Sequence, residues 1–206
     1  MNIILLIGIM PIPDDILVVD AVSHAYNLTR SNYRIEDDAQ AVVGMVNGLE
    51  RGMPERIQRT QETIETDWDP EDTFNVLFKE SQTDFSVFHP QTINVFHDGM
   101  TANYKAGEIV EAHPDRMAAL CSVDMVAMDD PQAELERQAN EWGSHGVKVY
   151  PSYWDEDNPQ DFFMDDPDKA FPLWEKCVDL GMDVVAVHKA IPFGKVATEP
   201  YKSTDV

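Results

Sequence analysis

The stretch PQAELERQANEWGSHGVKVY, residues 131–150, joins a helix signal to a strand signal. Residues 131–142 begin with proline and carry the pattern of a helix, and Gly143 directly after them is a residue that commonly ends helices. Residues 146–150 then form a short run rich in valine, which is typical of a buried strand. A helix followed directly by such a strand is the repeating unit of an α/β protein with a parallel sheet.

The same unit recurs along the chain, and the spacing of apolar residues sets the expected elements. We expect strands at residues 16–22, 85–88, 117–123, 146–150 and 183–187, the first of them fully buried. We expect helices at residues 37–51, 54–65, 69–79, 102–112, 131–142 and 167–180, the first two forming an insertion after the first strand. Strands that alternate with helices of ten or more residues indicate parallel pairing.

The number of strands and the chain length together indicate a partial barrel. A closed (β/α)8 barrel has eight strands and typically about 250 residues, whereas this chain has 206 residues. The predicted fold is therefore α/β, the first five βα units of a (β/α)8 barrel. We expect one domain over residues 1–206, with residues 1–14 as an N-terminal extension.

Composition excludes some classes of partner. Lys and Arg total 15 against 38 Asp and Glu, which gives a net charge of -23. Such a charge repels nucleic acids and anionic lipids, so neither is expected as a partner. The apolar residues 2–9 are too few to span a bilayer and lack the features of a signal peptide, so a cytoplasmic location is expected. Cys121 and Cys177 are expected as buried thiols.

Two histidines stand where parallel strands are expected to end. His24 follows the first predicted strand, and His188 follows the fifth. Side chains on a strand alternate between its faces, so Asp20 is expected on the same face as His24. Active sites of (β/α)8 barrels lie at the carboxyl ends of the strands, and neutral histidine is a common ligand of divalent metals. The pattern predicts a metal site formed by His24 and His188.

Other polar side chains are candidates for contact with a substrate. Lys148 alternates with two valines in the fourth predicted strand, so its ammonium is expected to point into the barrel and bind an anionic group. His89 and His97 follow the second strand, and both are expected to line a substrate pocket. His113 and His145 lie beside helix ends, where interaction with the helix dipole is the simpler interpretation.

An ordered set of segments carries a resemblance to a known family. They are AHPDRMAAL at 112–120, DPQAELER at 130–137, GSHGVKVYP at 143–151, FPLWE at 171–175 and Val187-His188. Together they resemble the amidohydrolase-related family of metal-dependent (β/α)8 barrels, which includes aminocarboxymuconate semialdehyde decarboxylase and resorcylate-type decarboxylases. The resemblance covers residues 16–206 and identifies the chain as the N-terminal portion of such a barrel.

The resemblance also implies ligands for a divalent metal ion, zinc or manganese. Asp20 to His24 matches the family's D-x-H-x-H motif, with His24 as the second histidine, and His188 matches the ligand after the fifth strand. Val22 stands where the family has the first ligand, and an apolar side chain cannot bind a cation. The resemblance therefore implies that the site has lost a ligand or that Asp20 or water completes it. The aspartate of the eighth strand has no counterpart within the 206 residues.

Three functions remain open from the sequence. The first is a metal-dependent hydrolase acting on a small carboxylated or cyclic substrate, expected to be inactive as this portion alone. The second is a non-oxidative decarboxylase on the same scaffold, and the third is a barrel remnant without catalysis that acts as a binding subunit. Because a partial barrel leaves strand edges unpaired, a homo-oligomer is expected.

Overall fold

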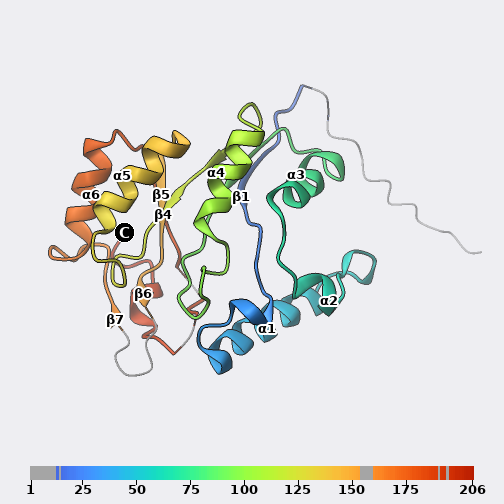
Figure 1. Cartoon of the computed structure of the whole chain (residues 1–206), viewed down its shortest axis with the longest axis horizontal. Helices are drawn as coiled ribbons and strands as arrows, with labels where there is room; N and C mark the ends of the chain where they lie inside the picture. The colour runs from blue at the N-terminus through green and yellow to red at the C-terminus, as the bar shows by residue number, and fades with distance from the viewer. Residues whose placement is uncertain (1–12, 14, 154–159, 190, 194) are drawn as a thin grey trace, which may run out of the picture.

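Five parallel strand positions run in sequence order through the computed structural model, which describes residues 13, 15–153, 160–189, 191–193 and 195–206 (Figure 1). The strands are β1 (Val19–Ser23), β2 (Phe85–Phe88), β3 (Met117–Ala119) with its continuation β4 (Cys121–Ser122), β5 (Gly146–Val149) and β8 (Val184–Val187). β1, β2 and β3 form one sheet, and β4, β5 and β8 form a second. This is the order of the first five strands of a (β/α)8 barrel, as predicted, and the described residues do not close the barrel.

The predicted third strand changes partners at Leu120. Before this residue β3 pairs with β2, and after it β4 pairs with β5. The amide of Leu120 itself donates to the carbonyl of Phe88 at 2.9 Å, which keeps the two sheets connected through one continuous segment.

Four helices follow the strands in a single outer layer (Figure 1). They are α3 (Pro70–Lys79), α4 (Asn103–Ala112), α5 (Pro131–Trp142) and α6 (Ala170–Asp179). Local signals fix their ends: the Asp130 carboxylate accepts from the Ala133 amide at 2.9 Å, and Gly143 ends α5 with φ of 62°. α6 begins later than predicted because the Asp166 carboxylate accepts the amides of Asp168 and Lys169 in a separate turn.

The main core lies between these helices and one face of the strands. Phe88, Cys121 and Val147 from the strands are fully buried against Leu135 of α5 and Ala106 of α4. Both cysteines are free and buried, as predicted, and burial raises the pKa of each thiol to about 11. A thiol so rarely ionised is a packing residue and not a nucleophile.

The insertion after β1 forms a second core at the carboxyl ends of the strands. α1 (Glu36–Arg51) and the short α2 (Gln61–Ile64) pack with the loop that contains Val95 and Phe96, and with Tyr150 after β5. The predicted single helix over residues 54–65 is wrong. Two short helices, η2 (Glu55–Ile57) and α2, replace it, because the chain is extended at Gln58 and Thr60 begins α2 by accepting the amide of Thr63.

The prediction that residues 16–22 form a fully buried strand is also wrong. Val19 and Val22 of β1 are 49% and 51% exposed, and Val184 of β8 is 48% exposed. β1 and β8 each pair with a strand on one side only, so their outer edges are not covered by the described residues. The described residues also leave uncovered the inner face of the sheets, the face that points away from the helices. A hollow of about 660 Å³ runs along this inner face and is lined mainly by apolar residues such as Val87 and Ala186.

Smaller elements complete the description. η1 (Arg30–Asn32) precedes α1, a short antiparallel pair joins β6 (Ser152–Tyr153) to β7 (Gln160–Asp161), and η3 (Glu199–Tyr201) lies near the end of the chain. The predicted N-terminal extension, residues 1–14, lies outside the described residues apart from residue 13. None of the helices described combines the length and apolar character needed to cross a membrane.

The exposed edges of β1 and β8 predict self-association. Light scattering after size-exclusion chromatography should show a mass that grows with protein concentration, and grows further with added salt, because salt screens the net charge of -23. Replacing Val19 and Val184 with lysine should return the protein toward a monomer. Val178→Lys on α6, where the valine is 76% exposed, is the control and should change nothing. A single monomeric species at every concentration would contradict the prediction.

The ion pair between Glu50 and Arg59 predicts a stability that depends on pH. The Glu50 carboxylate accepts hydrogen bonds from the backbone amide of Arg59 at 2.6 Å and from the Arg59 guanidinium at 2.8 Å. These bonds lower the pKa of Glu50 below its ordinary value of 4.5. The stabilisation is therefore complete above about pH 5 and is lost as pH falls through the lowered pKa. Urea unfolding should show Glu50→Gln less stable by about 1 kcal/mol at pH 7, with the difference shrinking toward pH 3.

Candidate functional site

His24 directly follows β1, and the backbone around it fixes its ring. Its Nδ1 lies 2.7 Å from the carbonyl oxygen of His89, so Nδ1–H is the donor and Nε2 keeps its lone pair. The ring also stacks on Tyr26, with centroids 5.3 Å apart. Burial lowers the pKa of His24 to about 4, and His89, Lys148 and His188 lower it further through their charge. His24 is therefore neutral at pH 7, and its Nε2 accepts a hydrogen bond from the side-chain amide of Gln91 at 3.5 Å. A ligand at Nε2 would have to displace that amide.

A bulge in β1 separates Asp20 from His24. Asp20 pairs with Ser86, but Ser23 pairs with Phe88, so β1 uses one more residue than β2 over this span. Asp20 and Ser23 consequently lie on the same face as Ser86, and His24 lies on the opposite face. The Asp20 carboxylate accepts the amide of Val22 at 3.0 Å. The expectation that Asp20 shares a face with His24 is wrong, because strict alternation does not hold across a bulge.

His188 directly follows β8, and its ring is fixed in the same manner. Its Nε2 lies 2.8 Å from the carbonyl oxygen of Ile191, which makes Nε2–H the donor and leaves the Nδ1 lone pair free. Tyr150 stacks on the ring at 5.0 Å between centroids, and burial lowers the pKa of His188. His188 thus offers a second neutral imidazole near enough to His24 to affect its pKa.

The segment after His188 is anchored to the end of the described chain. Lys189 donates to the Asp205 carboxylate at 2.7 Å and to the carbonyl of Pro200, also at 2.7 Å. The side chains of Lys189 and Asp205 are 15% and 5% exposed. Such a sheltered ion pair holds the backbone beside His188 in place.

Lys148 and His89 complete a group of four nitrogen-bearing side chains at the carboxyl ends of β1, β2, β5 and β8. Burial lowers the pKa of Lys148, whose ammonium lies 5.3 Å from the centre of the Tyr150 ring. Among the residues that the structure describes, Lys148 forms no ion pair. His89 is 5% exposed, its ring meets that of His24 edge-on at 6.0 Å, and its Nδ1 has no hydrogen-bond partner.

Sequence reasoning gave His89 little weight, although its position after a strand was a usable signal. Its significance depends on the pairing of β1 with β2, which brings it to His24 across 65 positions of sequence. Burial lowers the pKa of His89 to about 4, with Lys148 acting in the same direction. The ring is therefore a third neutral imidazole beside the two predicted ones.

His97 lies elsewhere. It is exposed and lines a separate hollow of about 440 Å³, formed by loop residues that include Arg34, Asp124 and Tyr153. His113 ends α4, as expected, and its Nε2 lies 2.7 Å from the Glu71 carboxylate. His145 lines the apolar hollow on the inner face.

The described donors fit a divalent metal in part. His24 and His188 are neutral, and a backbone carbonyl sets the tautomer of each ring, which is the usual arrangement for a histidine ligand. The Nε2 of His24 accepts from the Gln91 amide at 3.5 Å. Over the described ranges, however, no group of three or more His, Cys, Asp or Glu side chains is arranged to hold an ion. Val22 lacks a donor atom, and Asp20 is on the far face.

Residues 55–204 match the family model Amidohydro_2, described as amidohydrolase. The chain belongs to the amidohydrolase family. A search among curated proteins gives no match. The family matched is the one expected from the segments at 112–188. The match covers all four parallel strand positions after the first: β2, β3 with β4, β5 and β8.

Solved structures agree with this fold. An uncharacterised TIM-barrel protein from Bordetella bronchiseptica has a TM-score of 0.59 at 18% identity, covering 87% of this chain and 57% of that one. A 5-carboxyvanillate decarboxylase from Novosphingobium aromaticivorans, with bound manganese, has a TM-score of 0.57 at 18% identity over 85% and 51%. A 2,6-dihydroxybenzoate decarboxylase has 0.55 at 17% identity over 86% and 51%. The chain thus spans little more than half the length of these structures.

Proposed function

We propose that the chain carries part of the active site of a metal-dependent decarboxylase acting on a small carboxylated ring compound. The observation that carries the proposal is the pair of neutral imidazoles, His24 and His188, beside the ammonium of Lys148. The Nε2 of His24 has only a long contact, 3.5 Å, with the side-chain amide of Gln91, which a metal ion would displace. The two imidazoles would hold a divalent ion, zinc or manganese, and water or substrate oxygens would fill its other positions. A metal bound there would polarise the carboxylate of the substrate.

Lys148 would bind the anionic substrate. Its ammonium is half-buried and unpaired among the described side chains, so a carboxylate would recover part of the cost of its burial. Tyr150 lies beside both Lys148 and His188 and offers an aromatic face to a planar ring. The chemistry of this group favours a substrate that is both planar and negatively charged.

The similar structures support decarboxylation over hydrolysis. A 2,6-dihydroxybenzoate decarboxylase and a 5-carboxyvanillate decarboxylase are among them. The ammonium of Lys148 beside the ring of Tyr150 suits a carboxylate carried on a planar ring, as both of those names describe.

Metal titration tests the proposal directly. Calorimetry with Mn²⁺ or Zn²⁺ should give about one site per chain, and His24→Ala or His188→Ala should weaken binding at least 10-fold because each removes a ligand. His113→Ala is the matched control, since that ring is bonded to Glu71 on the outer layer. Failure of the unmodified chain to bind either ion would favour the remnant without catalysis.

Release of carbon dioxide tests the reaction. With 2,6-dihydroxybenzoate as probe and Mn²⁺ present, a protein in which these residues are part of a complete barrel should form carbon dioxide and resorcinol in equal amounts, because the described residues carry only part of the site. Lys148→Met should raise KM about 10-fold or more with a smaller effect on kcat, because it removes a group that binds the carboxylate. Hydrolysis of an amide or lactone probe, with no carbon dioxide released from carboxylates, would instead identify a hydrolase.

A further inference from the structure

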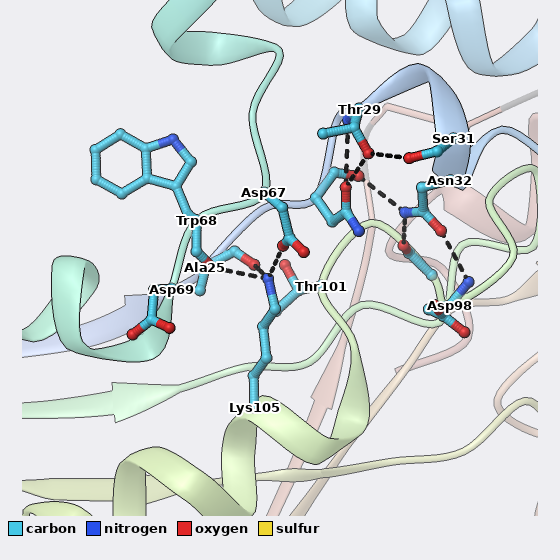
Figure 2. A network of polar contacts seen from close by, with 12 residues as sticks. Ala25, Thr29, Ser31, Asn32, Asp67, Trp68, Asp69, Asp98, Thr101 and Lys105 are labelled. Carbon is cyan, nitrogen blue, oxygen red and sulfur yellow. Dashed lines mark hydrogen bonds and ion pairs between the residues drawn. The ribbon is translucent and has the colours of Figure 1, made fainter.

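Lys105 is the most deeply buried cation in the described structure, and it lies at the segment that follows His24. The residue is 1% exposed and belongs to α4, on the side of the sheet that faces the helices. An ammonium at such a position is costly to bury unless acceptors surround it. Figure 2 shows the Lys105 side chain extending from α4 toward Ala25, Asp67 and Trp68.

Three acceptors surround the ammonium of Lys105. It donates to the carbonyl of Ala25 at 3.1 Å, to the carbonyl of Trp68 at 2.7 Å and to the Asp67 carboxylate at 2.5 Å. An ammonium has three protons, so its hydrogen bonds are complete. The Asp67 side chain is 46% exposed, so the counter-charge is at the surface while the two carbonyls hold the inner end.

One of these acceptors belongs to the backbone that carries His24, and a second belongs to a residue that is hydrogen-bonded to that backbone. Ala25 is the next residue after His24, and the amide of Trp68 donates to the carbonyl of Tyr26, whose ring stacks on His24. On the other side of His24, the carbonyl of Ser23 accepts the amide of His89. Strand pairing therefore fixes the backbone on the N-terminal side of His24, and Lys105 fixes it on the C-terminal side.

We propose that Lys105 is a positioning residue for His24: by binding the carbonyls of Ala25 and Trp68, it holds the His24 ring in the orientation in which Nδ1–H meets the His89 carbonyl. The Nε2 atom, which accepts from the Gln91 amide at 3.5 Å, then has one fixed direction. The role in metal binding rests on the proposed function, whereas the orientation of the ring does not.

Lys105→Met tests this role, because methionine has nearly the same length and donates no hydrogen bond. Nitrogen-15 NMR of the metal-free chain at pH 7 distinguishes protonated from unprotonated ring nitrogens, and His24→Ala identifies the signals of His24. The unmodified chain should show protonated Nδ1, and Lys105→Met a mixture of the two tautomers. Mn²⁺ affinity should fall by about 10- to 100-fold, the range for groups that orient a ligand.

Leu173→Ala in α6 provides the control for lost stability. Leu173 is 1% exposed in the same core, so its truncation destabilises the fold without touching the segment after His24. This variant should keep the single tautomer and the unmodified Mn²⁺ affinity. If Lys105→Met fails to fold, Lys105→Arg keeps the charge but moves the donors, and should give a smaller share of the second tautomer.

A folded Lys105 variant with unchanged His24 signals would overturn the proposal, as would a Leu173→Ala variant that disturbs them equally. Absence of Mn²⁺ binding in the unmodified chain would count against the proposed function alone. The tautomer measurement would then still decide the role of Lys105.

Discussion

The parallel pairing of five strands is the constraint on which the rest of the structure depends. Because the paired strands of the two main sheets all run in the same direction, the residues that directly follow β1, β2, β5 and β8 meet at one rim. His24, His89 and His188 are close to one another only for this reason, since long stretches of sequence separate them. The helices pack against the outer face of the sheets and supply the core that keeps the strands in register.

The sequence predicted those parts of the fold that local signals determine. α5 matches the predicted residues 131–142 because proline, an aspartate cap and Gly143 all act within the helix or next to it. The five strand positions were predicted from apolar runs, and the family was predicted from an ordered set of segments that the match over residues 55–204 confirms. Residues 54–65 show the limit of this reasoning, because helical periodicity was present but the extended residues 58–60 divide the segment.

The parts that were missed depend on partners distant in the sequence. The face on which Asp20 lies follows from a bulge that is defined only by pairing with β2, and periodicity within β1 cannot reveal it. The exposure of β1 likewise depends on what covers it and not on its own apolar residues. His24 and His188 were identified from position alone, but their neutral state and fixed tautomers come from carbonyls of His89 and Ile191.

The insertion between β1 and β2 also has a consequence for how the molecule assembles during folding. β3 to β8 are joined by short helical connections, whereas His24 must meet His89 across 65 residues. Closing a longer loop costs more chain entropy before any contact compensates for it. On this ground we expect β1 to dock after the later βα units, which would make the imidazole that follows β1 the last of the three to reach the rim.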